Sequence, residues 1–196
     1  MATLTELLGR IWMDGYHQEE KYEEIEERLE HLESDNTSAK EKHDNICKID
    51  HAVDKGYNSL FYATLFLSNK DPEESWLGRI IRIAESIETD PDLMRSLFTD
   101  KDHEDKTILV LLIETERDNS EADPDDPETT RQPMRRNYIQ FLCQKYRALG
   151  LTTQITEAQQ FCNSEGIDLT LNTMGGFRKR RKSKRKKSKS RKSRKS

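Results

Sequence analysis

The residues best suited to chemistry in this chain are cations that lie close together near its C-terminal end. Fourteen of the nineteen residues from 178 to 196 are Lys or Arg, and none is acidic. Such a string can approach nucleic-acid phosphates and release the counterions condensed on them. No aromatic residue lies among these cations, so base stacking is unavailable and we expect RNA or DNA to be bound largely without sequence preference. The predicted binding residues are Arg178, Lys179, Arg180, Arg181, Lys182, Lys184, Arg185, Lys186, Lys187, Lys189, Arg191, Lys192, Arg194 and Lys195.

The same cations also fit a nuclear import signal, so an import receptor is a second expected partner. Import requires only the cluster at 178–187, and the cations that continue to Lys195 favour nucleic-acid binding in addition. We expect the protein to lie in the nucleus. A nucleolar location and an additional cytoplasmic pool are both compatible with the sequence. Phosphorylation would add about −1.5 to −2 charge per site and weaken phosphate binding. The candidate phosphorylation sites are Ser183, Ser188, Ser190 and Ser193.

The rest of the chain carries the opposite charge. Residues 1–177 hold 19 of the 33 cations and all 37 acids, a formal charge of −18. An acidic body of this kind suits contacts with a protein partner, whose identity the sequence does not reveal. The acidic residues at 118–128 and the glutamate-rich N-terminal segment could also hold the cations of the same chain when nucleic acid is absent.

The body is predicted to be mostly α-helical and to begin with a coiled-coil-like helix over 1–36. Leu4, Leu8 and Ile11 recur at helical spacing, and the apolar register continues after a polar break. This pattern is typical of a coiled coil, which would allow a homo-oligomer, or of a helical hairpin that folds back onto its own body. Eight glutamates between 19 and 33 disfavour a parallel pair of identical helices. The predicted coiled-coil residues are Tyr22, Ile25, Leu29 and Leu32.

A compact helical body is expected over 39–172. Asp71-Pro72 and Asp90-Pro91 are typical helix starts, and Gly150 is placed to end a helix over 134–149. The apolar run at 108–113 fits either a helix or a strand. An acidic, proline-containing loop is expected at 118–133, and a disordered Lys/Arg/Ser tail at 173–196.

Two segments of the body resemble the opening of an ankyrin repeat, in which G-x-T-x-L-x-x-A leads from a turn into the first helix. They are KGYNSLFYA at 55–63 and EDKTILVLL at 104–112. The resemblance implies paired helices that stack on one another and a protein-interaction adaptor, of cellular or viral origin, for which the tail is only an import signal. The matching positions are Gly56, Asn58, Leu60 and Ala63 in the first segment and Asp105, Thr107, Leu109 and Leu112 in the second.

No motif predicts an enzyme, a cofactor or a metal site. Asn58-Ser59-Leu60-Phe61 resembles the nucleophile segment of ovarian-tumour-type deubiquitinases, but Ser59 replaces the cysteine whose thiolate that chemistry uses. His43, Cys47 and His51 share a helical face but span too great a length to meet at one ion. Three widely spaced cysteines suit reduced thiols in the nucleus or cytosol, and no apolar stretch is long enough to predict a membrane span.

Overall fold

A computed structural model describes residues 2–14, 19–47, 56–87, 92–120 and 134–173. These residues form helices and connecting segments without any strand, which confirms the mostly α prediction and resolves the apolar run at 108–113 as helical. The elements are α1 (Leu4–Asp14), α2 (Glu19–Glu33), α3 (Ala39–Cys47), α4 (Ser59–Leu65), α5 (Trp76–Glu85), α6 (Leu93–Thr99), α7 (Ile108–Ser120), α8 (Arg136–Ala148), α9 (Thr152–Ser164) and the 3-10 turn η1 (Leu171–Thr173).

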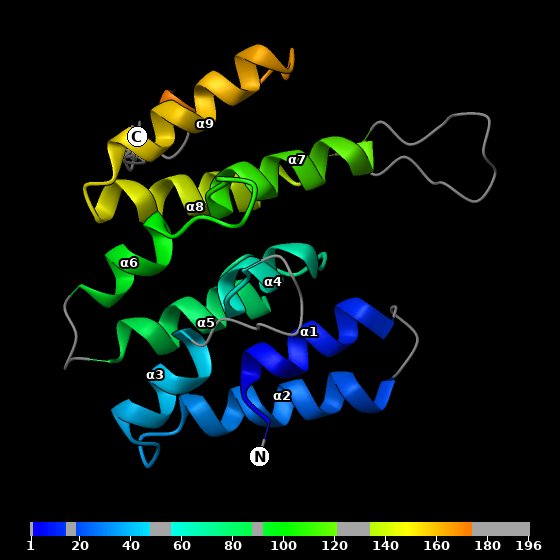
Figure 1. The fold of residues 1–196 in the computed structure, drawn as a ribbon, viewed down its shortest axis with the longest axis vertical. Helices are drawn as coiled ribbons and strands as arrows, with labels where there is room; N and C mark the ends of the chain where they lie inside the picture. Colours follow the sequence, from blue (N-terminus) through cyan, green and yellow to red (C-terminus); the bar gives the residue numbers. More distant parts are fainter. Residues whose placement is uncertain (1, 15–18, 48–55, 88–91, 121–133, 174–196) are drawn as a thin grey trace, which may run out of the picture.

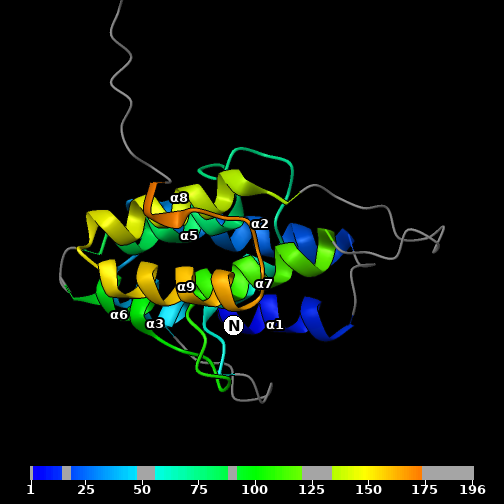
Figure 2. The same cartoon turned by 90° about the horizontal axis from the view of Figure 1, so that it is seen from above.

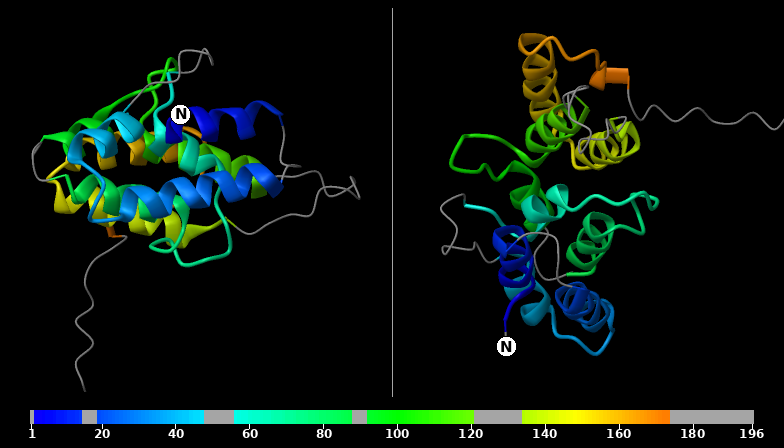
Figure 3. Two further views of the ribbon diagram at one scale, coloured as in Figure 1. Left: turned by 90° about the horizontal axis from the view of Figure 1, so that it is seen from below. Right: turned by 90° about the vertical axis from the view of Figure 1, so that its right-hand side faces the viewer.

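Seven of the described helices form two adjacent rows, while α3 packs on α1, α4 and α5, and α6 packs on α5. Helices α1, α4, α7 and α9 follow one another in the first row, and each contacts the next. Helices α2, α5 and α8 lie beside them in the second row, as the right-hand view of Figure 3 shows. In Figure 1, α2 runs back alongside α1, and α8 runs back alongside α7. The fold is therefore a stack of helix pairs along the long axis of the molecule.

One hydrophobic core extends through the whole stack, from Leu4 in α1 to Leu171 in η1. This corrects the expectation of a separate N-terminal coiled-coil-like helix over 1–36. Residues 4–33 form two helices that pack on each other, and α1 also packs on α4 while α2 packs on α5. Ile25, Leu29 and Leu32 are fully buried, and Tyr22 packs against Trp76 of α5. The apolar stripe is used inside the chain, as in the alternative of a hairpin folded onto its own body.

The two segments that resemble each other occupy equivalent places in the stack. Gly56 and Asp105 have left-handed backbone conformations, with φ of 68° and 63°, and each lies three residues before a first-row helix. Asn58 caps α4 by accepting hydrogen bonds from the N–H groups of Leu60 and Phe61. Ahead of α7, the Asp102 carboxylate accepts the N–H groups of Glu104 and Lys106. Helices α4 and α7 then pack side by side.

A buried ion pair joins the end of α7 to the start of α8. Glu116 is 1% exposed, and its carboxylate lies 3.2 Å from Nε of Arg135. The same carboxylate accepts the backbone N–H of Arg135, whose guanidinium also donates to the carbonyl of Leu67. Since α7 continues to Ser120, the acidic loop expected at 118–133 begins later than predicted, and its remaining residues lie outside the described ranges.

Candidate functional site: charged faces of the stack

The predicted nucleic-acid-binding cations at 178–195 and the four candidate phosphorylation sites lie outside the described residues. The described chain ends at η1, whose position is held by neighbouring helices. Arg147 of α8 donates to the carbonyl of Leu171, and Gln159 of α9 accepts the Leu171 N–H at 2.7 Å. Figure 2 shows η1 beside α8 and α9. The last described residues are therefore held in place against α8 and α9.

Helix α2 bears eight glutamates against two cations, and its two sides are treated differently by the fold. On the side that meets α5, Arg79 contacts Glu26 and lies 2.7 Å from Glu33, and Arg82 lies 3.2 Å from Glu33. The indole N–H of Trp76 also donates to Glu26, at 2.7 Å. These contacts neutralise the inner acids and fix α2 to α5.

The pKa values of this network follow from its geometry. Partial burial by itself raises the pKa of Glu33, but hydrogen bonds and charge interactions with Arg79 and Arg82 outweigh burial and hold that pKa below its ordinary value. For Arg79, burial by itself lowers the pKa, while Glu33 and Glu26 together raise it. Both groups are therefore held in their charged forms.

The opposite side of α2 has no such partners within the described part of the chain. Five glutamates at spacings of three or four positions share this outward side, so they lie on one helical face. All five are exposed, and no described residue forms an ion pair with them. We call this surface the acidic face of α2: it consists of Glu20, Glu23, Glu24, Glu27 and Glu30.

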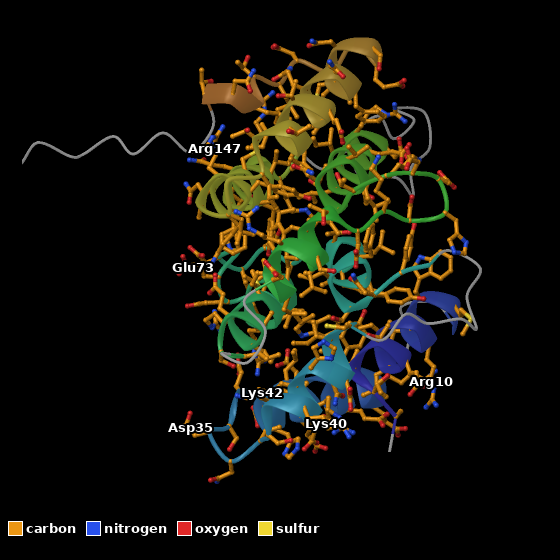
Figure 4. The ribbon with its side chains drawn as sticks, turned by 60° about the vertical axis from the view of Figure 1, so that its left-hand side comes forward. Arg10, Asp35, Lys40, Lys42, Glu73 and Arg147 are labelled. Atoms are coloured by element: carbon orange, nitrogen blue, oxygen red, sulfur yellow. The ribbon has the colours of Figure 1, made fainter. Side chains whose placement is uncertain are left out.

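At the other end of the second row, α8 carries Arg136, Lys145 and Arg147 and no acid. Lys145 lies 2.5 Å from Glu85, and Arg136 reaches the carbonyl of Asp168 at 3.5 Å. Figure 4 shows Arg147 at one end of the stack and Asp35, just after α2, at the other. The cations of α8 and the acidic face of α2 thus lie at opposite ends of the second row.

The other candidate sites do not assemble. Ser59, the residue in the nucleophile-like segment, is fully buried and donates to the carbonyl of Ile46 at 2.9 Å. His43 and Cys47 lie on α3, His51 lies outside the described residues, and no group that could hold a metal ion is found in the described part of the chain. Cys143 and Cys162 are buried thiols, and burial raises the pKa of Cys143 to about 11.

Sequence reasoning missed the pairing between α2 and α5. Arg79 and Arg82 are three positions apart, so they share a face of α5, and this spacing signals an acidic partner without identifying it.

Among the described helices, none is both long enough and apolar enough to cross a bilayer. No protein-family model, curated protein or solved structure matches the chain.

Proposed function

We propose that the chain is a non-enzymatic nuclear scaffold whose Lys/Arg segment binds RNA or DNA phosphates while the helix stack binds a protein. The separation of charge carries this proposal: fourteen cations follow residue 177, and residues 1–177 have a formal charge of −18. Anchoring of η1 by Arg147 and Gln159 supports it further, because it fixes the described end of the chain on the body only a few residues before the first of the cations, Arg178. Nucleic acid would be bound through its backbone and mainly at low to moderate salt.

A second candidate function is a protein-interaction adaptor of ankyrin-like type, with the cations serving only for import. The equivalent turns at Gly56 and Asp105, each leading into a first-row helix, favour this candidate. Stacked helix pairs also offer an extended surface to a protein partner. Protein binding by the stack is common to both candidates, so nucleic-acid binding is the property that separates them.

A salt titration tests the proposal. The binding of a fluorescein-labelled oligonucleotide would be followed by anisotropy for the full chain and for a chain that ends at Gly176. Six phosphate contacts give a slope of log K against log salt of about −4 on single strands and about −5 on duplex DNA. We expect such a slope for the full chain and its loss in the shortened chain.

A chain that ends at Lys187 is the matched control, because it keeps the import cluster at 178–187. The proposed function predicts that this chain binds more weakly and with a shallower slope than the full chain. If neither the full chain nor the control binds the oligonucleotide near physiological salt, the adaptor candidate replaces the scaffold. Circular dichroism should give the same helical signal for all three chains.

A further inference from the structure

We propose that the acidic face of α2 is a docking surface for the Lys/Arg segment 178–195 of the same chain. The proposal rests on the proposed function, since it describes what occupies the cations when nucleic acid is absent. It identifies the partner of a surface that the fold leaves exposed. Nucleic acid and α2 then compete for the same cations.

The first support is the contrast between the two sides of α2. Glu26 and Glu33 have cationic partners on α5, whereas the acidic face has none among the described residues. Like charges three and four positions apart on a helix destabilise it by roughly 0.2–0.5 kcal/mol per pair. Glu20 repels Glu23 and Glu24, and Glu27 repels Glu30. A cationic segment along this face would replace these repulsions by attractions.

The second support is charge complementarity together with reach. The twenty-two residues from 174 to 195 can span on the order of 70 Å when extended. Packed helices lie about 8–10 Å apart, so α2, two helices from α8 in the same row, lies on the order of 20–30 Å from the anchored η1. The segment is therefore long enough to reach α2 and still to place several of its cations along the acidic face of α2.

The third support is the distribution of charge along the second row. Helix α8, which holds η1 through Arg147, carries cations and no acid, so it repels the segment. The exposed cations of α5 already pair with acids, since Arg82 contacts Glu33. Helix α2 is the most acidic element, with eight glutamates against two cations. Along this row the segment therefore gains most by lying on α2.

Docking lowers the apparent affinity for nucleic acid in proportion to the docked fraction. If nine tenths of the molecules hold the segment on α2, the dissociation constant is about tenfold weaker than that of the free segment. Because the attraction is between exposed charges, salt weakens docking as well as nucleic-acid binding.

The test uses three full-length chains. In the first variant, Glu20, Glu23, Glu24, Glu27 and Glu30 are replaced by Gln, which keeps helix propensity and removes like-charge pairs. The control variant removes five exposed acids from other segments of the chain: Asp35→Asn, Glu73→Gln, Glu74→Gln, Glu157→Gln and Asp168→Asn. Labelled oligo(dT) is titrated against each chain at about 0.1 M salt, where the screening length is about 10 Å.

We expect the α2 variant to bind oligo(dT) several-fold, and up to about tenfold, more tightly than the control variant. Equal affinities of the two variants would overturn the proposal, because the effect would then come from net charge alone. Tighter binding after replacement of the acids at 118–128, with no change in the α2 variant, would instead assign the docking surface to that segment.

Carbodiimide cross-linking of the wild-type chain provides a readout that does not depend on nucleic acid. We expect intramolecular amide links from lysines of segment 178–195 to the acidic face, at a yield that is independent of dilution and falls when oligo(dT) is added. Links spread equally over the control acids would contradict docking. Cross-links to α2 in a chain that does not bind oligo(dT) would support the docking proposal and contradict the proposed function.

Discussion

At the scale of single residues, the attachment of α2 to α5 depends on which glutamates of α2 are paired, and not on how many glutamates the helix contains. Glu33 bridges Arg79 and Arg82, while Glu30, one turn earlier on α2, has no ion-pair partner among the described residues. The sequence shows a glutamate-rich helix but not this division, because the two arginines lie 46 and 49 residues away from Glu33 along the chain. Pairing at such separations depends on the stacking of α2 on α5.

The depressed pKa of Glu33 makes a stability prediction with a definite sign. A carboxylate whose pKa is lowered on folding contributes stability above its unfolded pKa of about 4.3 and loses that contribution as pH falls through the folded value. Glu33→Gln should therefore lower the free energy of unfolding by up to about 1 kcal/mol at neutral pH. The deficit should shrink as the pH falls below the unfolded pKa and through the lowered folded pKa, as urea denaturation at a series of pH values would show.

Glu30→Gln is the matched control for this prediction. It removes the same charge from the same helix, but from the acidic face, so it should leave the free energy of unfolding unchanged or slightly higher at neutral pH. A deficit for Glu33→Gln that is as large at pH 2.5 as at pH 7 would show that shape or packing, and not the ion pair, is responsible.

At the scale of elements, the turns before α4 and α7 show what the sequence could and could not reveal. Their similarity was readable because the pattern is local, and both turns contain the left-handed residue that it requires. The sequence left two alternatives open for the N-terminal helices, because a heptad stripe is the same in a coiled coil and in a hairpin. The difference lies in burial of Ile25, Leu29 and Leu32 in the core of the stack, which is a tertiary property.

Opposite substitutions at the two left-handed positions test their equivalence. Gly56→Ala should cost about 1–2 kcal/mol, since a side chain strains this backbone and a Cβ atom would lie 2.6 Å from Cδ2 of His103. Asp105→Gly should have an effect close to zero or be mildly stabilising, because glycine adopts a φ of 63° without strain. Urea denaturation of both variants provides the measurement, and a large loss of stability in Asp105→Gly would contradict the equivalence.

At the scale of the whole molecule, a single core predicts a single cooperative transition. Helix α1 packs on α4, and α2 packs on α5. Deletion of residues 1–38 would therefore expose the apolar sides of α4 and α5. We expect the deleted chain to lose its cooperative thermal transition, measured by circular dichroism. A chain that ends at Gly176 should retain it, because the described core ends at Leu171. A sharp thermal transition in the chain without residues 1–38 would contradict this expectation and support a separate N-terminal coiled coil.

The charge separation of the molecule was predictable without a fold, because it is a property of composition along the chain. The placement of the two charged faces was not, since it depends on the order in which α8, α5 and α2 are stacked. The anchoring of η1 by Arg147 and Gln159 was equally hidden, because it joins residues that are 24 and 12 positions apart through tertiary contacts.

The buried pair of Glu116 and Arg135 has an evolutionary consequence. The pair joins the end of α7 to the start of α8. These two ends therefore stay together regardless of the length of the segment that connects them. Doubling the length of a flexible connection costs only about 0.6 kcal/mol. We therefore expect insertions and deletions between these helices to be nearly neutral for the fold, and homologues to vary more in length there than within the helices.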